Sequence, residues 1–301
     1  MSDPASESAA DELTVLEPTP PSIGQCALLA CMWEATAPKP GNVHRGADFE
    51  DLVYPDFLNA AAVTAPLFEA AHATPLGQTV LAAVRATRAA VNTNANLGAI
   101  LLLAPLASVP REQELASGVA TVLANLTQAD ARDVYAAIRH AEPGGLGQTD
   151  AHDVRDAAPA DLIVAMRAAA DRDLVARQYA NDFADLFGEV VPAIQAGLAA
   201  GWPLWQTIVH VHVQTMHRHP DSLIARKCGP PVAEMAAAYA GVVLAAGPPD
   251  SEEFQDALAD LDFWLRSDGH RRNPGTTADM IAAGLFVALR DGIIKAPFRW
   301  T

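Results

Sequence analysis

The chain is short of basic residues and of long apolar runs, and each shortage excludes a class of protein. Lysine and arginine number 20 against 36 aspartate and glutamate residues, which gives a formal net charge of −16. Binding to nucleic acid needs a basic surface, so we expect no nucleic-acid partner. The sequence also has no unbroken apolar run of about 18 residues, so we expect no membrane span.

Cysteine is scarce as well, and its pattern indicates a cellular compartment. The three cysteines, Cys26, Cys31 and Cys228, are odd in number and lack the spacings that bind metals. They are typical of reduced, buried thiols, so we expect a cytoplasmic location. Residues 1–21 are acidic, contain serine and proline and have no apolar core. This composition predicts a disordered lead-in and not a secretory signal.

What the chain has in abundance is alanine within a half-hydrophobic composition. Alanine favours closely packed helices, and the β-branched runs that favour strands are scarce. No repeat of fixed period and no strand pair joined by a hairpin turn is evident. The prediction is therefore an all-α fold in which residues 22–301 form a single multi-helix domain. The sequence does not predict an oligomeric state.

Proline and glycine divide the chain into helical segments. Ser22, Thr127 and Thr276 are suitable N-caps, and Pro203 suits the first turn of a helix. The alternation at 209–213 could form a strand, but it lies inside a longer helical pattern. The predicted helices span residues 23–34, 55–73, 77–91, 97–106, 127–140, 161–187, 203–220, 232–246, 252–265 and 276–290.

The loop after the first predicted helix is dense in functional groups. Residues 38–45 read Pro-Lys-Pro-Gly-Asn-Val-His-Arg. The two prolines fix φ, and the glycine can take a φ that other residues cannot. A rigid loop presenting Lys39, Asn42, His44 and Asp48 together suits a polyphosphate and metal platform. An ordinary polar loop between helices is the alternative.

Two further segments combine carboxylates with cations. In Asp171-Arg-Asp-Leu, the acids lie on the predicted helix 161–187, where they either form a solvated face or hold a divalent cation. In Asp221-Ser-Leu-Ile-Ala-Arg-Lys, an acid stands beside Arg226 and Lys227. Arginine binds phosphate bidentately and lysine binds it as a point charge.

Three other segments offer backbone or amide groups to a phosphate. Asn-Thr-Asn-Ala-Asn at 92–96 precedes a buried helix, and Asn-Pro-Gly-Thr-Thr-Ala-Asp at 273–279 opens the last one. Free N–H groups at helix starts bind anions, although plain capping is the alternative for both segments. Gly-Gly-Leu-Gly at 144–147 lacks the preceding strand and the Lys-Ser/Thr of a phosphate loop, which favours a flexible turn.

Taken in order, these segments resemble the triphosphoribosyl-dephospho-CoA synthase family over roughly residues 22–295. The resemblance implies a transferase that moves the triphosphoribosyl group of ATP onto a hydroxyl of 3-dephospho-CoA and releases adenine. The expected partners are these small molecules, with Mg²⁺ as cofactor. The implied catalytic residues are Glu34, His44, Asp48 and Asp171, with the general base open among the first three. The implied Mg²⁺ ligands are Asp171, Asp173 and Asp221, and the implied ATP or substrate contacts are Lys39, Gly41, Asn42, Asn92, Thr93, Asn94, Arg172, Arg226, Lys227 and Gly275.

The sequence departs from the family pattern at two places. Ala95 and Asn96 stand where the family usually has His-Lys, and His44 replaces an acid common in the citrate- and malonate-lyase members. A related ribosyl transferase of another cofactor pathway, such as pterin-type C1 metabolism, is therefore an alternative. A Mg²⁺-dependent, all-helical nucleotide or ADP-ribose hydrolase is a second alternative, and a non-catalytic nucleotide-binding protein is a third.

Overall fold

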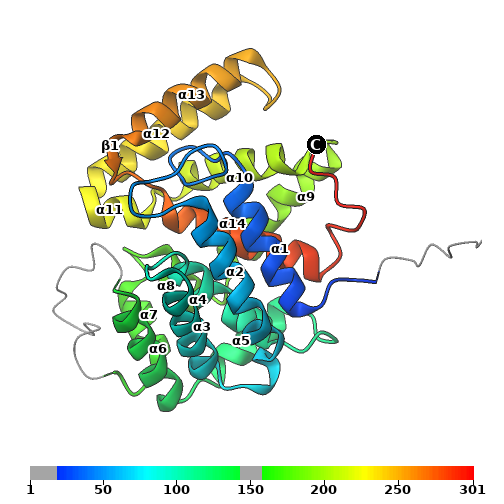
Figure 1. The fold of residues 1–301 in the computed structure, drawn as a ribbon, viewed down its shortest axis with the longest axis vertical. Coiled ribbons are helices and arrows are strands. Elements are labelled where there is room, and N and C mark those ends of the chain that lie inside the picture. Colours follow the sequence, from blue (N-terminus) through cyan, green and yellow to red (C-terminus); the bar gives the residue numbers. More distant parts are fainter. Residues whose placement is uncertain (1–18, 143–157) are drawn as a thin grey trace, which may run out of the picture.

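The computed structural model describes residues 19–142 and 158–301, and over these ranges the chain forms fourteen α-helices (Figure 1). The all-α prediction is confirmed. The one strand within the two ranges, β1 (Ser267–His270), is four residues long. None of the described helices is long and apolar enough to cross a membrane. The expected turn at 144–147 and most of the lead-in 1–21 lie outside the described residues.

In the first half of the chain the predicted helices are present, but the helix Leu115–Ala124 was not predicted, and the predicted helix 55–73 ends at Glu69 and is followed by a 3₁₀ turn. There the helices are α1 (Ile23–Thr36), α2 (Tyr54–Glu69), the 3₁₀ turn η1 (Ala71–Ala73), α3 (Leu76–Val91), α4 (Leu97–Ser108), α5 (Leu115–Ala124) and α6 (Gln128–Ala141). The second half contains α7 (Leu162–Ala169), α8 (Leu174–Ala180), the π-helix η2 (Leu186–Val190), α9 (Val191–Ala199), α10 (Leu204–Arg218), α11 (Ser222–Cys228), α12 (Pro230–Ala246), α13 (Glu252–Arg266) and α14 (Gly275–Arg290).

Local capping explains where several helices begin. The Ser22 hydroxyl accepts the Gln25 N–H while the Gln25 side chain accepts the Ser22 N–H, which is a complete capping box. Thr127 and Asp130 form the same arrangement before α6. Thr276 was expected to cap the last helix, but α14 already begins at Gly275, so Thr276 lies in its first turn. The expected N-caps Ser22 and Thr127 are confirmed, and their capping boxes satisfy donors that a helix start leaves unpaired.

The predicted helix 161–187 is wrong, because the chain breaks there into α7, α8 and η2. Asp173 accepts the N–H groups of Val175 and Ala176 and so starts a new helix at α8. Asp182 and Phe183 then take positive φ angles of 55° and 62°, which end α8. The proposed acidic stripe along one helix therefore does not exist, since aspartate side chains compete for backbone N–H groups.

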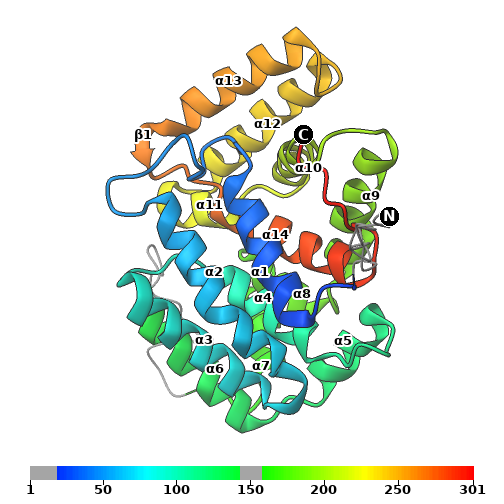
Figure 2. The ribbon, with the colours of Figure 1, turned by 45° about the vertical axis from the view of Figure 1, so that its right-hand side comes forward.

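Two helices in the middle of the molecule carry the core. α4 and α14 are apolar on nearly every side and lie among the other helices, as a fully buried helix must. A second, smaller core joins α10 to α13, and Leu258 packs against both cores. In both views, α12 and α13 project at one end while α3, α6 and α7 form the opposite end (Figure 2).

Candidate active site

A cavity of about 760 Å³ lies where segments from across the sequence meet. Its wall is built by α1, the loop after it, the segment 93–99, α6 to α8, α11 and the start of α14. A cavity of this size suits small-molecule substrates. Among the predicted site residues, those that line it are Glu34, Asn42, Thr93, Asn94, Arg172, Asp173, Arg226, Lys227 and Gly275.

The other predicted residues do not line the cavity. They are Lys39, Gly41, His44, Asp48, Asn92, Asp171 and Asp221.

Lys39 lies behind the cavity wall and contacts Glu34. The lysine side chain is completely buried, and its Nζ is 2.9 Å from Glu34 Oε1. Nζ also donates to the Glu34 carbonyl oxygen. The Glu34 side chain keeps 12% of its surface exposed and lines the cavity. The ammonium therefore supports a cavity carboxylate, and this position gives no support to a direct phosphate contact.

The rest of this loop is fixed by contacts with α13 and with the segment just before α14. Gly41 has a φ of +74°, and a Cβ there would lie 2.8 Å from Leu265 side-chain atoms, so glycine is required. Its N–H donates to Asp262 Oδ1 at 2.7 Å. Asn42 lines the cavity and donates through Nδ2 to Asn273 Oδ1. Asn42 Oδ1 is buried and has no hydrogen-bond donor among the described residues.

His44 and Asp48 belong to the same loop but do not line the cavity. His44 Nδ1 accepts the Gly46 N–H at 3.2 Å, and its backbone pairs with Ala47. Burial is the main cause that lowers the pKa of His44, with the Arg266 charge second. Asp48 is exposed and accepts the Tyr54 N–H at 2.7 Å. Of the candidate bases, only Glu34 reaches the cavity.

Asp279 is a cavity carboxylate that the sequence argument missed. A Cβ on Gly98 would lie only 1.9 Å from Asp279 Oδ2, so the carboxyl group packs directly on the first turn of α4. Burial raises the pKa of Asp279 well above its usual value, and the negative charges of Glu34 and Asp221 add to this effect. Raised carboxyl pKa values are common at catalytic sites. From the sequence, Asp279 was only part of the segment 273–279, for which phosphate binding and plain capping of the last helix were the two interpretations.

Cations line the cavity at the end of α11 and before α8. Arg226 forms an ion pair with Asp173, and its Nε is buried without a partner among the described residues. Burial lowers the pKa of Lys227, although Asp51 opposes the shift. Arg172 is exposed and donates to the Ala168 carbonyl at 3.3 Å. These groups could bind an anionic ligand that enters the cavity.

The amide segment after α3 has a structural part and a cavity part. Asn92 is exposed and adopts φ 54°, the left-handed conformation that often ends a helix. Asn94 Oδ1 accepts the Leu97 N–H at the start of α4, and Thr93 and Asn94 both line the cavity. Gly275 also lines it, and a Cβ there would lie 2.7 Å from a Leu223 methyl carbon.

The three predicted Mg²⁺ ligands do not converge, which corrects the sequence prediction. Asp221 is completely buried, and its two oxygens accept four hydrogen bonds, from Leu223 and Ile224 N–H and from Thr277 N–H and Oγ1. Burial raises the pKa of Asp221, and these bonds oppose that shift. Asp171 is exposed and does not line the cavity. Only Asp173 of the three reaches the cavity.

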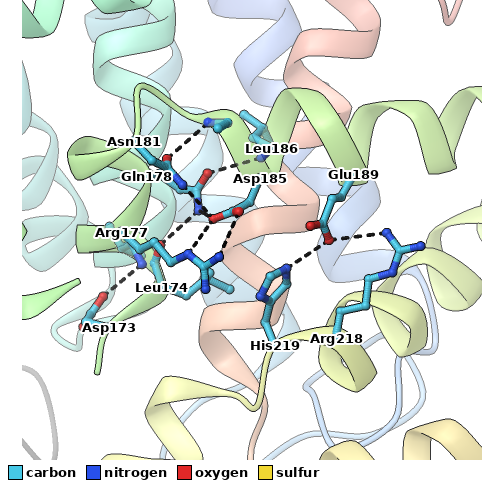
Figure 3. A network of polar contacts seen from close by, with 12 residues as sticks. Asp173, Leu174, Arg177, Gln178, Asn181, Asp185, Leu186, Glu189, Arg218 and His219 are labelled. Atoms are coloured by element: carbon cyan, nitrogen blue, oxygen red, sulfur yellow. Dashed lines mark hydrogen bonds and ion pairs between the residues drawn. The ribbon is translucent and has the colours of Figure 1, made fainter. Parts of the chain in front are cut away.

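One cluster of metal-ligand type occurs in the described ranges, and it lies outside the cavity. Asp185, Glu189 and His219 place one ligand atom each within 4.8 Å of one another (Figure 3). Arg177 pairs with Asp185 at 3.0 Å, and Arg218 and His219 pair with Glu189 at 3.3 and 3.0 Å. Both acids thus already have cationic partners. The ion pairs of Glu189 with Arg218 and His219 connect η2 to the end of α10.

The fold and the cavity indicate a class of protein. The chain is all-α over the described residues, and its cavity holds the carboxyl groups of Glu34 and Asp279 together with several cations, a set of groups that suits chemistry on a phosphorylated small molecule. A family model described as "ATP:dephospho-CoA triphosphoribosyl transferase" matches residues 20–297. The chain therefore belongs to this family of pentosyltransferases.

A solved structure supports the same assignment. It comes from Archaeoglobus fulgidus and is provisionally named a triphosphoribosyl-dephospho-coA synthase. The similarity has a TM-score of 0.60 and 26% sequence identity, and it covers 78% of this chain and 99% of that one. A comparison with curated proteins gave no match.

Proposed function

We propose that this chain transfers the 5-triphosphoribosyl group of ATP to a hydroxyl of 3-dephospho-CoA and releases adenine. The observation that carries the proposal is the pairing of Glu34 with Asp279 in one cavity with Arg226 and Lys227. Such a reaction needs acid and base groups at a sugar carbon and cations for a triphosphate. The family assignment supplies the substrates, and the cavity supplies the matching groups.

The reaction exchanges one bond at C1′ of the ATP ribose for another. The C1′–N9 bond breaks, its electron pair leaves with adenine, and C1′ passes through an oxocarbenium-like state. The acceptor oxygen attacks C1′ and loses its proton, while the adenine ring gains one. The triphosphate stays intact throughout. Carboxyl pairs perform the same acid and base work in other glycosyl transfers.

A carboxyl group with a raised pKa, Asp279, and an ion-paired carboxyl group, Glu34, suit these two proton transfers. The raised pKa of Asp279 favours its neutral form, so Asp279 would donate the proton to the departing adenine. Glu34 is ion-paired with Lys39 and would accept the proton of the attacking hydroxyl or stabilise the cationic sugar. Each such group typically contributes about 10²–10⁴-fold to the rate.

The triphosphate would be held by Arg226 and Lys227 with Arg172 at the edge of the cavity. The partnerless Nε of Arg226 is a donor that a phosphate oxygen could satisfy. We propose that Mg²⁺ accompanies ATP, with Asp173, the one predicted Mg²⁺ ligand that lines the cavity, as its protein ligand. Carboxylate and phosphate oxygens are hard ligands of the type Mg²⁺ prefers, and the ion would neutralise phosphate charge.

The direct test is to incubate the protein with ATP, Mg²⁺ and dephospho-CoA and to follow free adenine and a triphosphoribosylated product by mass spectrometry. Asp279→Asn and Glu34→Gln should each lower the rate of adenine release by about 10²-fold or more. Asp260→Asn, at an exposed position of α13, is the matched control and should leave the rate unchanged. Adenine release without any acceptor would indicate hydrolysis, and no adenine release at all would refute the proposal.

A further inference from the structure

The cavity has an apolar part besides its carboxyl groups and cations. Among the described residues, the cavity-lining side chains within α6, α7 and α8 are uncharged, and charged residues line the cavity only at the ends of these helices, with Glu142 after α6 and Arg172 and Asp173 between α7 and α8. We call this part the apolar chamber, and its defining residues are Ile138, Leu162, Ala165, Met166, Ala169 and Val175.

The apolar chamber and the carboxyl pair are carried by different groups of helices. Glu34 and Asp279 come from α1 and α14, which pack on each other and on α4. α6 packs mainly on α3, and α7 packs mainly on α8. In both views α6 and α7 lie at the end of the molecule opposite α12 and α13, with α14 between these two ends (Figures 1 and 2).

The two substrates differ in what they could place in such a chamber. The adenine of ATP is bonded to the reacting C1′, so it must lie beside the carboxyl pair. Dephospho-CoA carries a long pantetheine arm of methylene, methyl and amide groups that leaves its ribose through two phosphates. An extended, largely apolar arm fits an alkyl-lined wall, because burial of its CH₂ and CH₃ groups is favourable.

We propose that the apolar chamber binds the pantetheine arm of the acceptor and so selects dephospho-CoA over nucleotides that lack this arm. The proposal rests on the proposed transferase function and deepens it by naming the part of the acceptor that is recognised. The carboxyl pair then determines which bond is exchanged, and the chamber determines which alcohol is used.

Acceptor truncation tests the selection directly. Adenosine 5′-diphosphate is dephospho-CoA without its pantetheine arm, so the two acceptors present the same ribose hydroxyls. We expect kcat/KM, measured by adenine release at saturating ATP, to be at least about tenfold higher with dephospho-CoA. Failure to release adenine with either acceptor would refute the transferase function itself. Equal kcat/KM values would leave that function standing and overturn only the role of the chamber.

Substitutions on α7 locate the selection in the chamber. Ala169 lines the cavity and is only partly buried, whereas the adjacent Ala168 is exposed and does not line it. Ala169→Trp should fill the chamber and raise the KM for dephospho-CoA at least about tenfold, with the calorimetric Kd of ATP unchanged. Ala168→Trp, the matched control, should change neither quantity.

A milder variant covers the case in which Ala169→Trp does not fold. Ile138→Ala removes alkyl surface from the α6 side of the chamber without adding bulk. It should narrow the kcat/KM preference for dephospho-CoA over adenosine 5′-diphosphate by about threefold to tenfold. An unchanged kcat/KM preference in Ile138→Ala would overturn the proposal. A loss of ATP affinity in either chamber variant would also overturn it, because it would indicate that the adenine of ATP occupies the apolar chamber.

Discussion

Lys39 and Glu34 form an ion pair in which the lysine is completely buried and the glutamate faces the cavity, with 2.9 Å between Nζ and Oε1. Glu34 lies in the last turn of α1, and Lys39 lies in the Pro-Lys-Pro-Gly turn that follows this helix. The rigid turn thus directs its cation inward, toward a carboxylate, and not outward toward solvent. This relationship explains why a lysine occurs between two prolines.

The first prediction concerns the removal of this cation. Lys39→Met should lower the free energy of unfolding by about 3–5 kcal/mol, because it leaves a largely buried carboxylate without its partner. The affinity for ATP should change by less than about threefold, since Lys39 does not line the cavity. Urea unfolding and calorimetric ATP titration measure the two effects.

A double variant tests whether the stability loss of Lys39→Met comes from the unpaired Glu34 carboxylate. Adding Glu34→Gln to Lys39→Met removes the unpaired charge and should recover part of the lost stability. If Lys39→Met instead kept its stability and lost about 10- to 150-fold in ATP affinity, the direct phosphate contact suggested by the sequence would be right.

The second prediction follows from the raised pKa of Asp279. The folded protein holds this proton more tightly than the unfolded chain, whose aspartate pKa is about 3.9. The group therefore contributes stability below about pH 4 and loses it as the pH rises through the folded pKa. Glu34 and Asp221 face the group as further negative charges, and Arg226 opposes them.

Asp279→Asn cannot ionise and should escape this loss. Its thermal midpoint relative to the wild type should rise with pH from about pH 4 upward and level off above the folded pKa. The exposed Asp260→Asn variant should show no such trend. A difference that falls with pH would mean that Asp279 is stabilised as a carboxylate and is not the acid of the reaction.

The third prediction tests the cationic wall. Lys227 lines the cavity, and Lys227→Ala should weaken ATP binding by about 10- to 150-fold through loss of one charge-assisted contact. Lys295→Ala makes the same change of net charge at an exposed position outside the cavity. Calorimetric titration of both variants decides the matter, because equal losses would show only a long-range effect of charge.

The fourth prediction concerns Mg²⁺. If Asp173 and the triphosphate hold the ion together, ATP should bind more weakly in EDTA than in Mg²⁺, and Asp173→Asn should reduce that difference. Calorimetry reports this directly and needs no turnover. Asp171→Asn is the matched control, since Asp171 is exposed and does not line the cavity. Identical Mg²⁺ dependence in both variants and the wild type would exclude Asp173 as a ligand.

The sequence predicted the features that depend on local chemistry. The capping boxes at Ser22 and Thr127 involve residues three apart, so the helix starts that they define could be read directly. The same local chemistry was interpreted wrongly at Asp173. The sequence predicted this carboxylate on the surface of one helix over 161–187, whereas it caps the start of a new helix, α8. Short polar side chains allow both readings until the tertiary contacts are known.

The site itself depended on contacts between distant segments. Asp279 meets Gly98 across 181 positions, and neither residue carries a local sign of the other. Asp221 looked like a metal ligand, but its oxygens join the starts of α11 and α14. The family resemblance indicated which segments meet at the cavity. Which side chains of these segments line the cavity depends on tertiary packing and was known only from the structure.

The last prediction concerns His212, which is completely buried on α10 with neither ring nitrogen hydrogen-bonded among the described residues. Burial lowers the pKa of His212 well below its usual value, and the nearby Lys39 charge adds to the shift. The unfolded chain takes up a proton below about pH 6.5 while the folded protein does not, so the wild type loses stability as the pH falls.

His212→Leu removes both unsatisfied nitrogens and should raise the free energy of unfolding by about 1–3 kcal/mol at pH 8, with a larger gain at pH 5. Urea unfolding from pH 5 to 8 measures this, with the exposed His140→Leu as control. A loss of stability at pH 8 would show that a buried water or another partner satisfies the ring.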